Sequence, residues 1–245
     1  MAEAEADFTI SPMRPDEYDT CIDIAAEAFT TNNPMVMHLG LTLDEFKPLA
    51  RQMCPRKRTV DTGLSIAARD SDGKLLAFLF LQTLDLRKKE PTKDHEKGRF
   101  VHEAASRAYE TACSKPPPHG LCLGSLTSGK ALHCSMGGTS PSAAKKGIGK
   151  TLRLRAVEVA RERGYNTLVV EPGHVATRHI WSKYCGGVIK GEQELSSFRT
   201  KKGEHPFQGV VGSLSVAEIV VRKSRWDGIF FWPFYLAKLI VVMSN

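Results

Sequence analysis

Residues 137–155 read GGTSPSAAKKGIGKTLRLR, and the fold that we expect for the chain depends on this stretch. Residues 131–139 before the loop have the composition of a strand, and residues 166–172 read as a buried strand. Between them the sequence predicts a helix over 147–163, ending at Gly164, with one apolar face made by Ile148, Leu152, Ala156 and Val159. The order strand, glycine loop, helix, strand predicts a βαβ unit with parallel strands.

The glycine loop has the features of an anion-binding site. The first N–H groups of a helix have no intrahelical acceptor, and the helix dipole attracts negative charge to them. Gly147 and Gly149 would let the backbone approach a phosphate closely, and positive charge surrounds them on Lys145, Lys146 and Lys150. We therefore expect a phosphate or a pyrophosphate at this loop.

Two common phosphate-binding motifs do not fit the spacing. Gly149–Lys150–Thr151 matches the end of a P-loop, but Ala144 stands where the first glycine of that motif belongs. The dinucleotide-binding pattern fails because Leu152 replaces its third glycine, and because the loop lies past the middle of the chain.

The rest of the chain reads as alternating strands and helices with one unusual segment. Asp72–Gly73 between two apolar runs predicts a hairpin of strands 64–69 and 74–84. Thr42 and Glu45 form a capping box at the start of a helix. Residues 86–130 read as an insertion or a lid-like segment, with helical potential over 99–114; a domain boundary there is the weaker alternative. Further elements are expected at 8–13 and 15–29, before a break at 32–34, and at 176–185, 187–198 and 213–223.

Composition narrows the class of protein without identifying it. Of 245 residues, 42% are hydrophobic and 25% charged, as in soluble globular proteins, and the formal charge of +7 favours anionic partners. Residues 1–8 are acidic without an apolar run, so we expect no secretory signal and a cytoplasmic protein. The six cysteines show no metal-binding spacing, so we expect reduced thiols and no metal site.

Residues 229–243 form the most apolar run of the chain. As a helix they would span about 22 Å, which is short of the ~30 Å hydrocarbon core of a bilayer, and they contain Pro233 and Lys238. We therefore do not expect a transmembrane span. A peripheral membrane anchor, a partner-binding segment and a tail packed on the domain's own sheet all stay open.

The loop resembles the coenzyme A-binding motif of the GNAT superfamily of N-acetyltransferases, R/Q-x-x-G-x-G/A, which here reads Ala144–Lys145–Lys146–Gly147–Ile148–Gly149. Pro141 stands where the family often has a proline after its fourth strand, and the order of elements over 8–222 follows the family, nearest to its arylalkylamine and small-amine members. The resemblance implies an α/β fold with a mixed sheet of six to seven strands flanked by helices, and an insertion between the third and fourth strands. The acetyltransferase domain would cover 1–223, followed by a hydrophobic tail at 224–245.

The resemblance also implies acetyl-CoA as the cofactor. The family binds pyrophosphate chiefly through backbone amides, so Ala144 in place of Arg or Gln is tolerable. Gly137 and Gly138 fall where the fourth strand of the family bulges beside pantetheine, although they also suit a simple strand end. The cofactor-binding residues implied are Met136, Gly137, Gly138, Thr139, Ala144, Lys145, Lys146, Gly147, Ile148, Gly149 and Lys150.

In this family an amine attacks the acetyl thioester directly, which requires a base and benefits from an acid. Counting back from Gly147 places His133 at one position of a His-x-His pair known in arylalkylamine acetyltransferases, so His133 is the first candidate base and Glu171 the second. A structural histidine and a surface carboxylate are the alternatives. Tyr184 is the candidate acid, although Trp181 or Ser182 lies nearer the family's spacing.

At two other positions we do not expect a catalytic group. Insect relatives often carry an acid before a proline after the first helix, where this chain has Asn33–Pro34. Cys185 lacks a His/Asp arrangement that would make it a nucleophile, so we expect a buried thiol.

Three functions are compatible with the sequence. The first is an acetyl-CoA-dependent N-acetyltransferase acting on a small primary amine in a ternary complex, with no nucleic-acid partner. The second is a protein or peptide N-acetyltransferase, for which the basic charge and residues 86–130 would serve a polypeptide. The third is a catalytically degenerate fold that binds coenzyme A or serves as a membrane-associated scaffold. The acceptor amine and the oligomeric state do not follow from the sequence.

Overall fold

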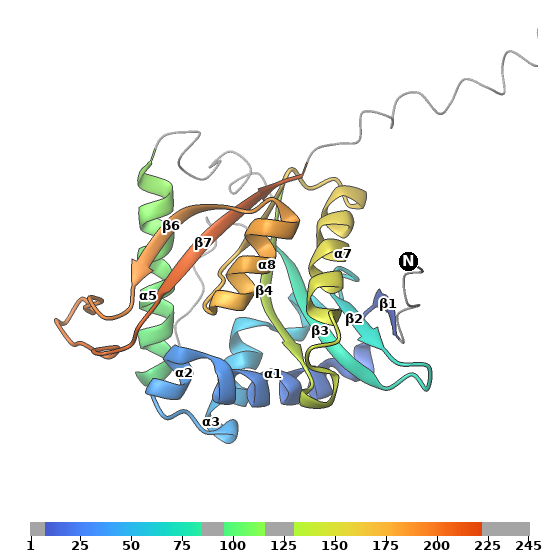
Figure 1. The fold of residues 1–245 in the computed structure, drawn as a ribbon, viewed down its shortest axis with the longest axis horizontal. Helices are drawn as coiled ribbons and strands as arrows, with labels where there is room; N and C mark the ends of the chain where they lie inside the picture. The colour runs from blue at the N-terminus through green and yellow to red at the C-terminus, as the bar shows by residue number, and fades with distance from the viewer. Residues whose placement is uncertain (1–7, 85–95, 116–129, 222–245) are drawn as a thin grey trace, which may run out of the picture.

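A single mixed sheet contains every strand of the structure, a computed structural model that describes residues 8–84, 96–115 and 130–221 (Figure 1). Its strand order is β1-β2-β3-β4-β5-β7-β6. The strands are β1 Thr9–Pro12, β2 Ile66–Arg69, β3 Leu75–Leu84, β4 Ala131–Thr139, β5 Thr167–Val170, β6 Val188–Glu194 and β7 Ser213–Val220. The pair β4–β5 is parallel and the other pairs are antiparallel, which confirms the predicted βαβ unit and the hairpin.

Helices cover both faces of the sheet. They are α1 Tyr18–Asn32, α2 Pro34–His38, α3 Leu43–Met53, α4 Arg56–Thr59, α5 Glu96–Ser114, α7 Ile148–Glu162 and α8 Val175–Cys185, with 3-10 turns at Pro15–Glu17 and Pro141–Ala143. The capping box of α3 forms as predicted, since Thr42 N–H donates to Glu45 Oε2 at 2.9 Å.

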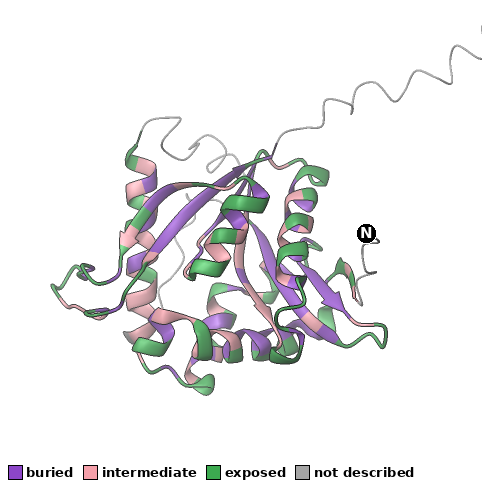
Figure 2. Cartoon of the chain, viewed as in Figure 1, coloured by how far each residue is buried: buried purple, intermediate pink, exposed green. Residues whose placement is uncertain are grey.

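Successive side chains of a strand point to opposite faces of the sheet, so the core has two layers, one on each face. Figure 2 shows the central strands as the most buried part. Leu79 and Leu81 of β3 pack with α7 and α8 on one face. Phe78 and Phe80 point to the other face, where α1 and α3 cover them. The apolar face of α7 predicted from the sequence is buried, including Ile148 and Leu152.

Helix α5 occupies the predicted insertion between the third and fourth strands of the sheet. Its Ala104, Ala108 and Ala112 are fully buried, and the last two pack with Val216 of β7. The described part of the insertion is therefore a packed layer of the fold. Strands on both sides of the insertion share one sheet, and whether the segment also acts as a lid stays a prediction.

One strand is shorter than its sequence pattern. We expected a strand over 187–198, but β6 ends at Glu194. Leu195 and Phe198 leave the sheet because they are buried in a separate apolar cluster, which they form with Phe207 of the β6–β7 loop, Met35 of α2 and Ala104 of α5. No helix in the described ranges is long and apolar enough to cross a membrane. The run 229–243 lies outside the described residues, as do Cys122 and residues 1–7.

A buried ion pair ties β2 to the start of α1. Glu17 and Arg69 are 8% and 6% exposed, and Arg69 Nε donates to Glu17 Oε1 at 2.6 Å. Burial raises the pKa of Glu17, but hydrogen bonds and charge from Arg69, with a hydrogen bond from Arg14, hold the pKa below its ordinary value. A carboxylate whose pKa is lowered by folding stabilises the folded state at pH values above its unfolded pKa, and this stabilisation is lost as the pH falls through the lowered pKa.

We expect Glu17→Gln to lower the free energy of unfolding by about 3 kcal/mol at pH 7, because Arg69 would keep a buried charge without its counter-ion. The wild-type protein should lose this difference as the pH falls below the ordinary Glu value of 4.5 and through the lowered pKa. Urea unfolding at several pH values measures both effects. Asp19→Asn is the control, because Asp19 pairs with Arg51 at the surface and its side chain is 73% exposed. A deficit that does not shrink at low pH would contradict this account.

Candidate functional site

Strands β4 and β5 separate at the point where the candidate site lies. They pair only over Ala131–Cys134 and Thr167–Val170, after which β5 ends and β4 continues along β3 to Thr139. β4 bulges at Ser135, because Phe80 pairs with Met136 while Leu81 pairs with Cys134. The fourth strand therefore does contain a bulge, but at Ser135 and not at Gly137 and Gly138, where we expected it. Beyond Cys134, β4 no longer pairs with β5.

His133 and Glu171 meet at this point. Nε2 of His133 lies 2.9 Å from Oε2 of Glu171, which follows the last residue of β5, and the two side chains are 13% and 19% exposed. Both candidate bases of the sequence are thus brought into one hydrogen-bonded pair. Nδ1 of His133 lies 3.5 Å from Nε2 of Gln82 on β3, the residue that pairs with His133 across the ladder.

The charge of Glu171 determines the proton position on the imidazole. Burial raises the pKa of Glu171, but the charge of His133 and the hydrogen bond from its imidazole lower the pKa below the usual range. An ionised carboxylate only accepts hydrogen bonds, so Nε2 of His133 must carry a proton. In the neutral ring Nδ1 is then the basic nitrogen.

The loop before α7 presents a row of unpaired donors. Lys145 and Gly147 have positive φ angles of 65° and 76°, and α7 begins at Ile148. Across the described ranges no hydrogen bond is found for the backbone N–H groups of Lys145, Lys146 and Gly147 in the loop, or of Ile148 and Gly149 in the first turn of α7. Consecutive N–H groups in such a turn form a concave site for an anion. These residues fit the pyrophosphate of coenzyme A.

The glycines of β4 have a packing role that the sequence did not indicate. A Cβ on Gly137 would lie 2.3 Å from Cδ2 of Leu79, and one on Gly138 would lie 2.9 Å from Cε1 of Phe78. The absent side chains therefore let β3 pack closely on β4. Backbone approach of a ligand to Met136, Gly137, Gly138 and Thr139 stays a prediction.

Tyr184 is not brought to the His133–Glu171 pair. Its side chain lies on the exposed side of α8, where Nζ of Lys150 sits 4.3 Å from the ring centroid and His179 packs edge-on. This places the phenol beside the start of α7. Trp181 is buried between the helices and the sheet, and Cys185 is a buried thiol whose pKa burial raises to about 11.

Three residues near the pair were not predicted from the sequence. Gln82 reaches the pair from β3, and Tyr109 of α5 packs against the buried cluster that contains Ala131 of β4 and Val169 of β5; neither residue sits in a recognisable motif. Asn33 lies beside the chain that follows Glu171, because a Cβ on Gly173 would be 3.4 Å from Asn33 Nδ2. Asn33 could have been identified as a helix cap, since Asn-Pro opens α2 and Asn33 Oδ1 accepts from the N–H of Met35 at 3.0 Å.

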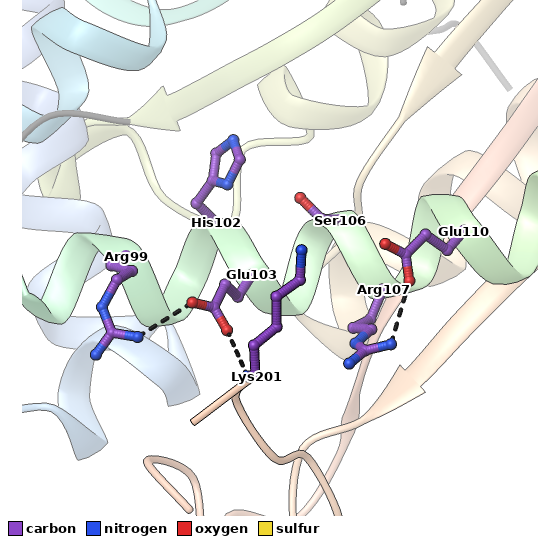
Figure 3. A pocket seen from close by; sticks show the side chains of 7 residues that line it. All are labelled: Arg99, His102, Glu103, Ser106, Arg107, Glu110 and Lys201. Carbon is purple, nitrogen blue, oxygen red and sulfur yellow. Dashed lines mark hydrogen bonds and ion pairs between the residues drawn. The ribbon is translucent and has the colours of Figure 1, made fainter. Parts of the chain in front are cut away.

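A cavity of about 250 Å³ lies on the outer side of α5 rather than at the pair (Figure 3). Four of its charged groups form salt bridges with each other, Arg99–Glu103 at 3.1 Å and Arg107–Glu110 at 3.3 Å. Its lining does not include His133 or Glu171. In the described part of the chain, no cluster of three or more His, Cys, Asp or Glu side chains could hold a metal ion.

The fold is that of the GNAT-superfamily acetyltransferases, as predicted. No protein-family model and no curated protein matches the sequence, but solved structures do. The C-terminal condensation domain of Ebony in complex with β-alanyl-dopamine aligns with a TM-score of 0.73 at 16% identity, over 89% of this chain and 100% of that one. Arylalkylamine N-acetyltransferase 2 from Aedes aegypti aligns at 0.66 and 17%, over 88% and 100%.

A third similar structure is the polyamine N-acetyltransferase of Drosophila melanogaster, at a TM-score of 0.54 and 13% identity, over 87% of this chain and 100% of that one. The expected fold class, with a mixed seven-stranded sheet flanked by helices, is confirmed.

Proposed function

We propose that this chain is an acetyl-CoA-dependent N-acetyltransferase that acts on a small primary amine by direct attack in a ternary complex. One observation carries the proposal: a single strand, β4, connects an acid–base pair to an anion site. His133 and Glu171 meet where β4 leaves β5, and β4 then leads into the unpaired N–H groups before α7. Acetyl transfer from a phosphorylated carrier needs both of these sites.

The loop would hold the pyrophosphate. Its five free N–H groups supply the hydrogen bonds, and Lys145, Lys146 and Lys150 supply charge from exposed positions. Ala144 contributes no side-chain donor, so affinity depends on the backbone and the lysines. Acetyl-CoA supplies a thioester, whose C–S bond breaks as the amine nitrogen bonds to the acetyl carbon.

The pair would take up the proton that the amine loses. The lowered pKa keeps Glu171 ionised, so a proton gained by the pair resides on His133, where the carboxylate stabilises the imidazolium. Glu171 also holds the ring orientation. The acceptor class is supported by amine-acetylating proteins of the same fold, which include arylalkylamine and polyamine acetyltransferases.

The alignment with a condensation domain favours a second candidate of the same reaction type. That domain is in complex with an amide of β-alanine and dopamine, so its acyl group is not acetyl. A chain of this fold could thus join an amine to a different thioester. The free N–H groups of the loop support coenzyme A as the carrier here.

Binding of acetyl-CoA should raise the melting temperature by several degrees, since a ligand at 100 times its Kd adds about 2.7 kcal/mol. Gly147→Asp should weaken this binding at least tenfold, because a carboxylate would stand over the N–H groups. Gly164→Asp is a matched control: Gly164 has a φ of 73° and open space at its Cβ, as Gly147 does, but lies at the other end of α7. No thermal shift at millimolar acetyl-CoA would contradict the cofactor.

A thiol-release assay then separates the functions. Aryl amines, polyamines and peptides are tested as acceptors with acetyl-CoA and with β-alanyl-CoA. Turnover of small amines with acetyl-CoA supports the proposal, turnover of peptides supports the protein acetyltransferase, and preference for β-alanyl-CoA supports the condensation reaction. Binding without turnover of any acceptor would indicate a degenerate fold.

A further inference from the structure

Arg153 of α7 places a guanidinium group beside the glycine loop. Its Nη1 donates to the carbonyl oxygen of Gly149, one turn earlier in the helix, at 2.7 Å, and a Cβ on Gly149 would lie 3.1 Å from the same nitrogen. Thr139, the last residue of β4, lies on the same side, since its Oγ1 would be 3.9 Å from that Cβ. The cation therefore lies next to the segment 145–149, whose N–H groups form the anion site.

Within the described ranges Arg153 has no counter-ion. Its Nε is buried without a hydrogen-bond acceptor, and its guanidinium carbon lies over the ring of Trp181, 5.6 Å from the centroid. The titratable groups that act on its charge are the thiols of Cys134 and Cys185. Burial raises the pKa of these thiols to about 12 and about 11, so both are neutral at pH 7. Neither thiol therefore balances the positive charge.

A cation held in this way lowers the stability of the free protein. A guanidinium stays protonated in proteins, and a buried charge without a partner is costly. Arg69, by contrast, is buried against the carboxylate of Glu17. An unsatisfied buried donor in a native structure requires an explanation, and a ligand is one. A ligand that brings negative charge to the loop would supply the partner that Arg153 lacks.

We propose that Arg153 is a binding residue for the acyl carrier: its guanidinium is the counter-ion of the pyrophosphate of coenzyme A at the loop. This inference rests on the proposed function, and it adds a half-buried side chain to a site made of backbone N–H groups and exposed lysines. A guanidinium binds phosphate through paired, charge-assisted hydrogen bonds. Arg153 would thus supply from the helix the arginine that is missing at Ala144.

The test is Arg153→Met, which removes the charge and keeps an apolar side chain against Trp181. We expect the Kd of acetyl-CoA, measured by calorimetry, to rise about tenfold to a hundredfold, as for loss of a hydrogen bond to a charged group. The Kd of S-acetylpantetheine, which has no pyrophosphate, should not change. The free variant should melt at the same or a higher temperature, because it no longer buries an unpaired cation.

Two further variants show whether the charge is responsible. Arg153→Lys keeps a positive charge and should recover part of the affinity for acetyl-CoA. Arg155→Met is the matched control on the same helix, because Arg155 pairs with Glu158 at 3.0 Å and with Glu162 at 2.6 Å on the outer side of α7. It should leave the Kd values of both ligands unchanged.

Inorganic pyrophosphate, tested by thermal shift, distinguishes this inference from the proposed function. If pyrophosphate stabilises the wild type but not Arg153→Met, the anion-binding role of Arg153 holds even in a protein that transfers no acetyl group. An unchanged Kd of acetyl-CoA in Arg153→Met would overturn the inference and leave the proposed function standing. A lower melting temperature, with equal losses for acetyl-CoA and S-acetylpantetheine, would show a structural role and overturn the inference as well.

Discussion

Replacing His133 by alanine is expected to lower kcat by about 10²–10⁴-fold at pH 7, the range by which a positioned general base accelerates a reaction. The reason is that His133 carries the basic nitrogen of the pair, while Glu171 has a lowered pKa and is a weak proton acceptor. The KM for acetyl-CoA should change little, because the free N–H groups that would bind it lie in a different segment, 145–149. Thiol release measured over pH 5–9 gives both quantities.

The pH dependence separates a base from a structural histidine. The acidic limb of the wild-type kcat/KM profile should belong to the coupled pair, so it should be lost or displaced in His133→Ala. His38→Ala serves as the control, because His38 is an exposed residue of α2. A His133→Ala enzyme that is slow but keeps the wild-type limb would remove His133 as the base.

Glu171→Gln tests the other half of the pair. The amide keeps the size of the side chain but not its charge, so an imidazolium on His133 would lose its counter-ion and kcat should fall. If the residues act as a unit, the double variant should be little worse than His133→Ala alone. Losses that multiply would indicate two independent roles.

The sequence predicts most of this site because its parts lie in one continuous segment. The strand, the loop and α7 are adjacent in the chain, and the helix periodicity fixes which residues face the sheet. Counting from Gly147 was enough to place His133 on the fourth strand. Glu171 followed from its place at the exit of the neighbouring parallel strand, where the two strands separate.

The parts that the sequence did not predict depend on long-range packing. Gln82 reaches His133 through the β3–β4 register, and Tyr109 lies beside β4, β5 and β7 because α5 packs on these strands. Neither contact leaves a periodic signal in the chain. Gly137 and Gly138 are a further example. A glycine can be required because a ligand approaches the backbone or because a neighbouring side chain such as Leu79 does, and the sequence does not distinguish these two causes.

The packing of α5 on β6 gives the largest effect on stability that we expect. A Cβ on Gly191 would lie 2.1 Å from the carbonyl oxygen of Ala108 and 2.7 Å from the backbone nitrogen of Ala112. Backbone atoms of a helix cannot rotate away as side-chain ends do. Gly191→Val should therefore lower the free energy of unfolding by about 5 kcal/mol, which exceeds most single substitutions.

Chemical unfolding measures this loss, and Gln193→Val on the same strand is the control for adding a β-branched residue at a less buried position. Amide hydrogen exchange of Gly191→Val shows where the strain is released. If α5 is a fixed layer, the amides of the whole sheet should lose protection from exchange together with those of α5. A Gly191→Val protein that is as stable as the wild type, and that loses protection from exchange only in α5, would contradict this expectation. It would show instead that α5 can leave the sheet as a lid does.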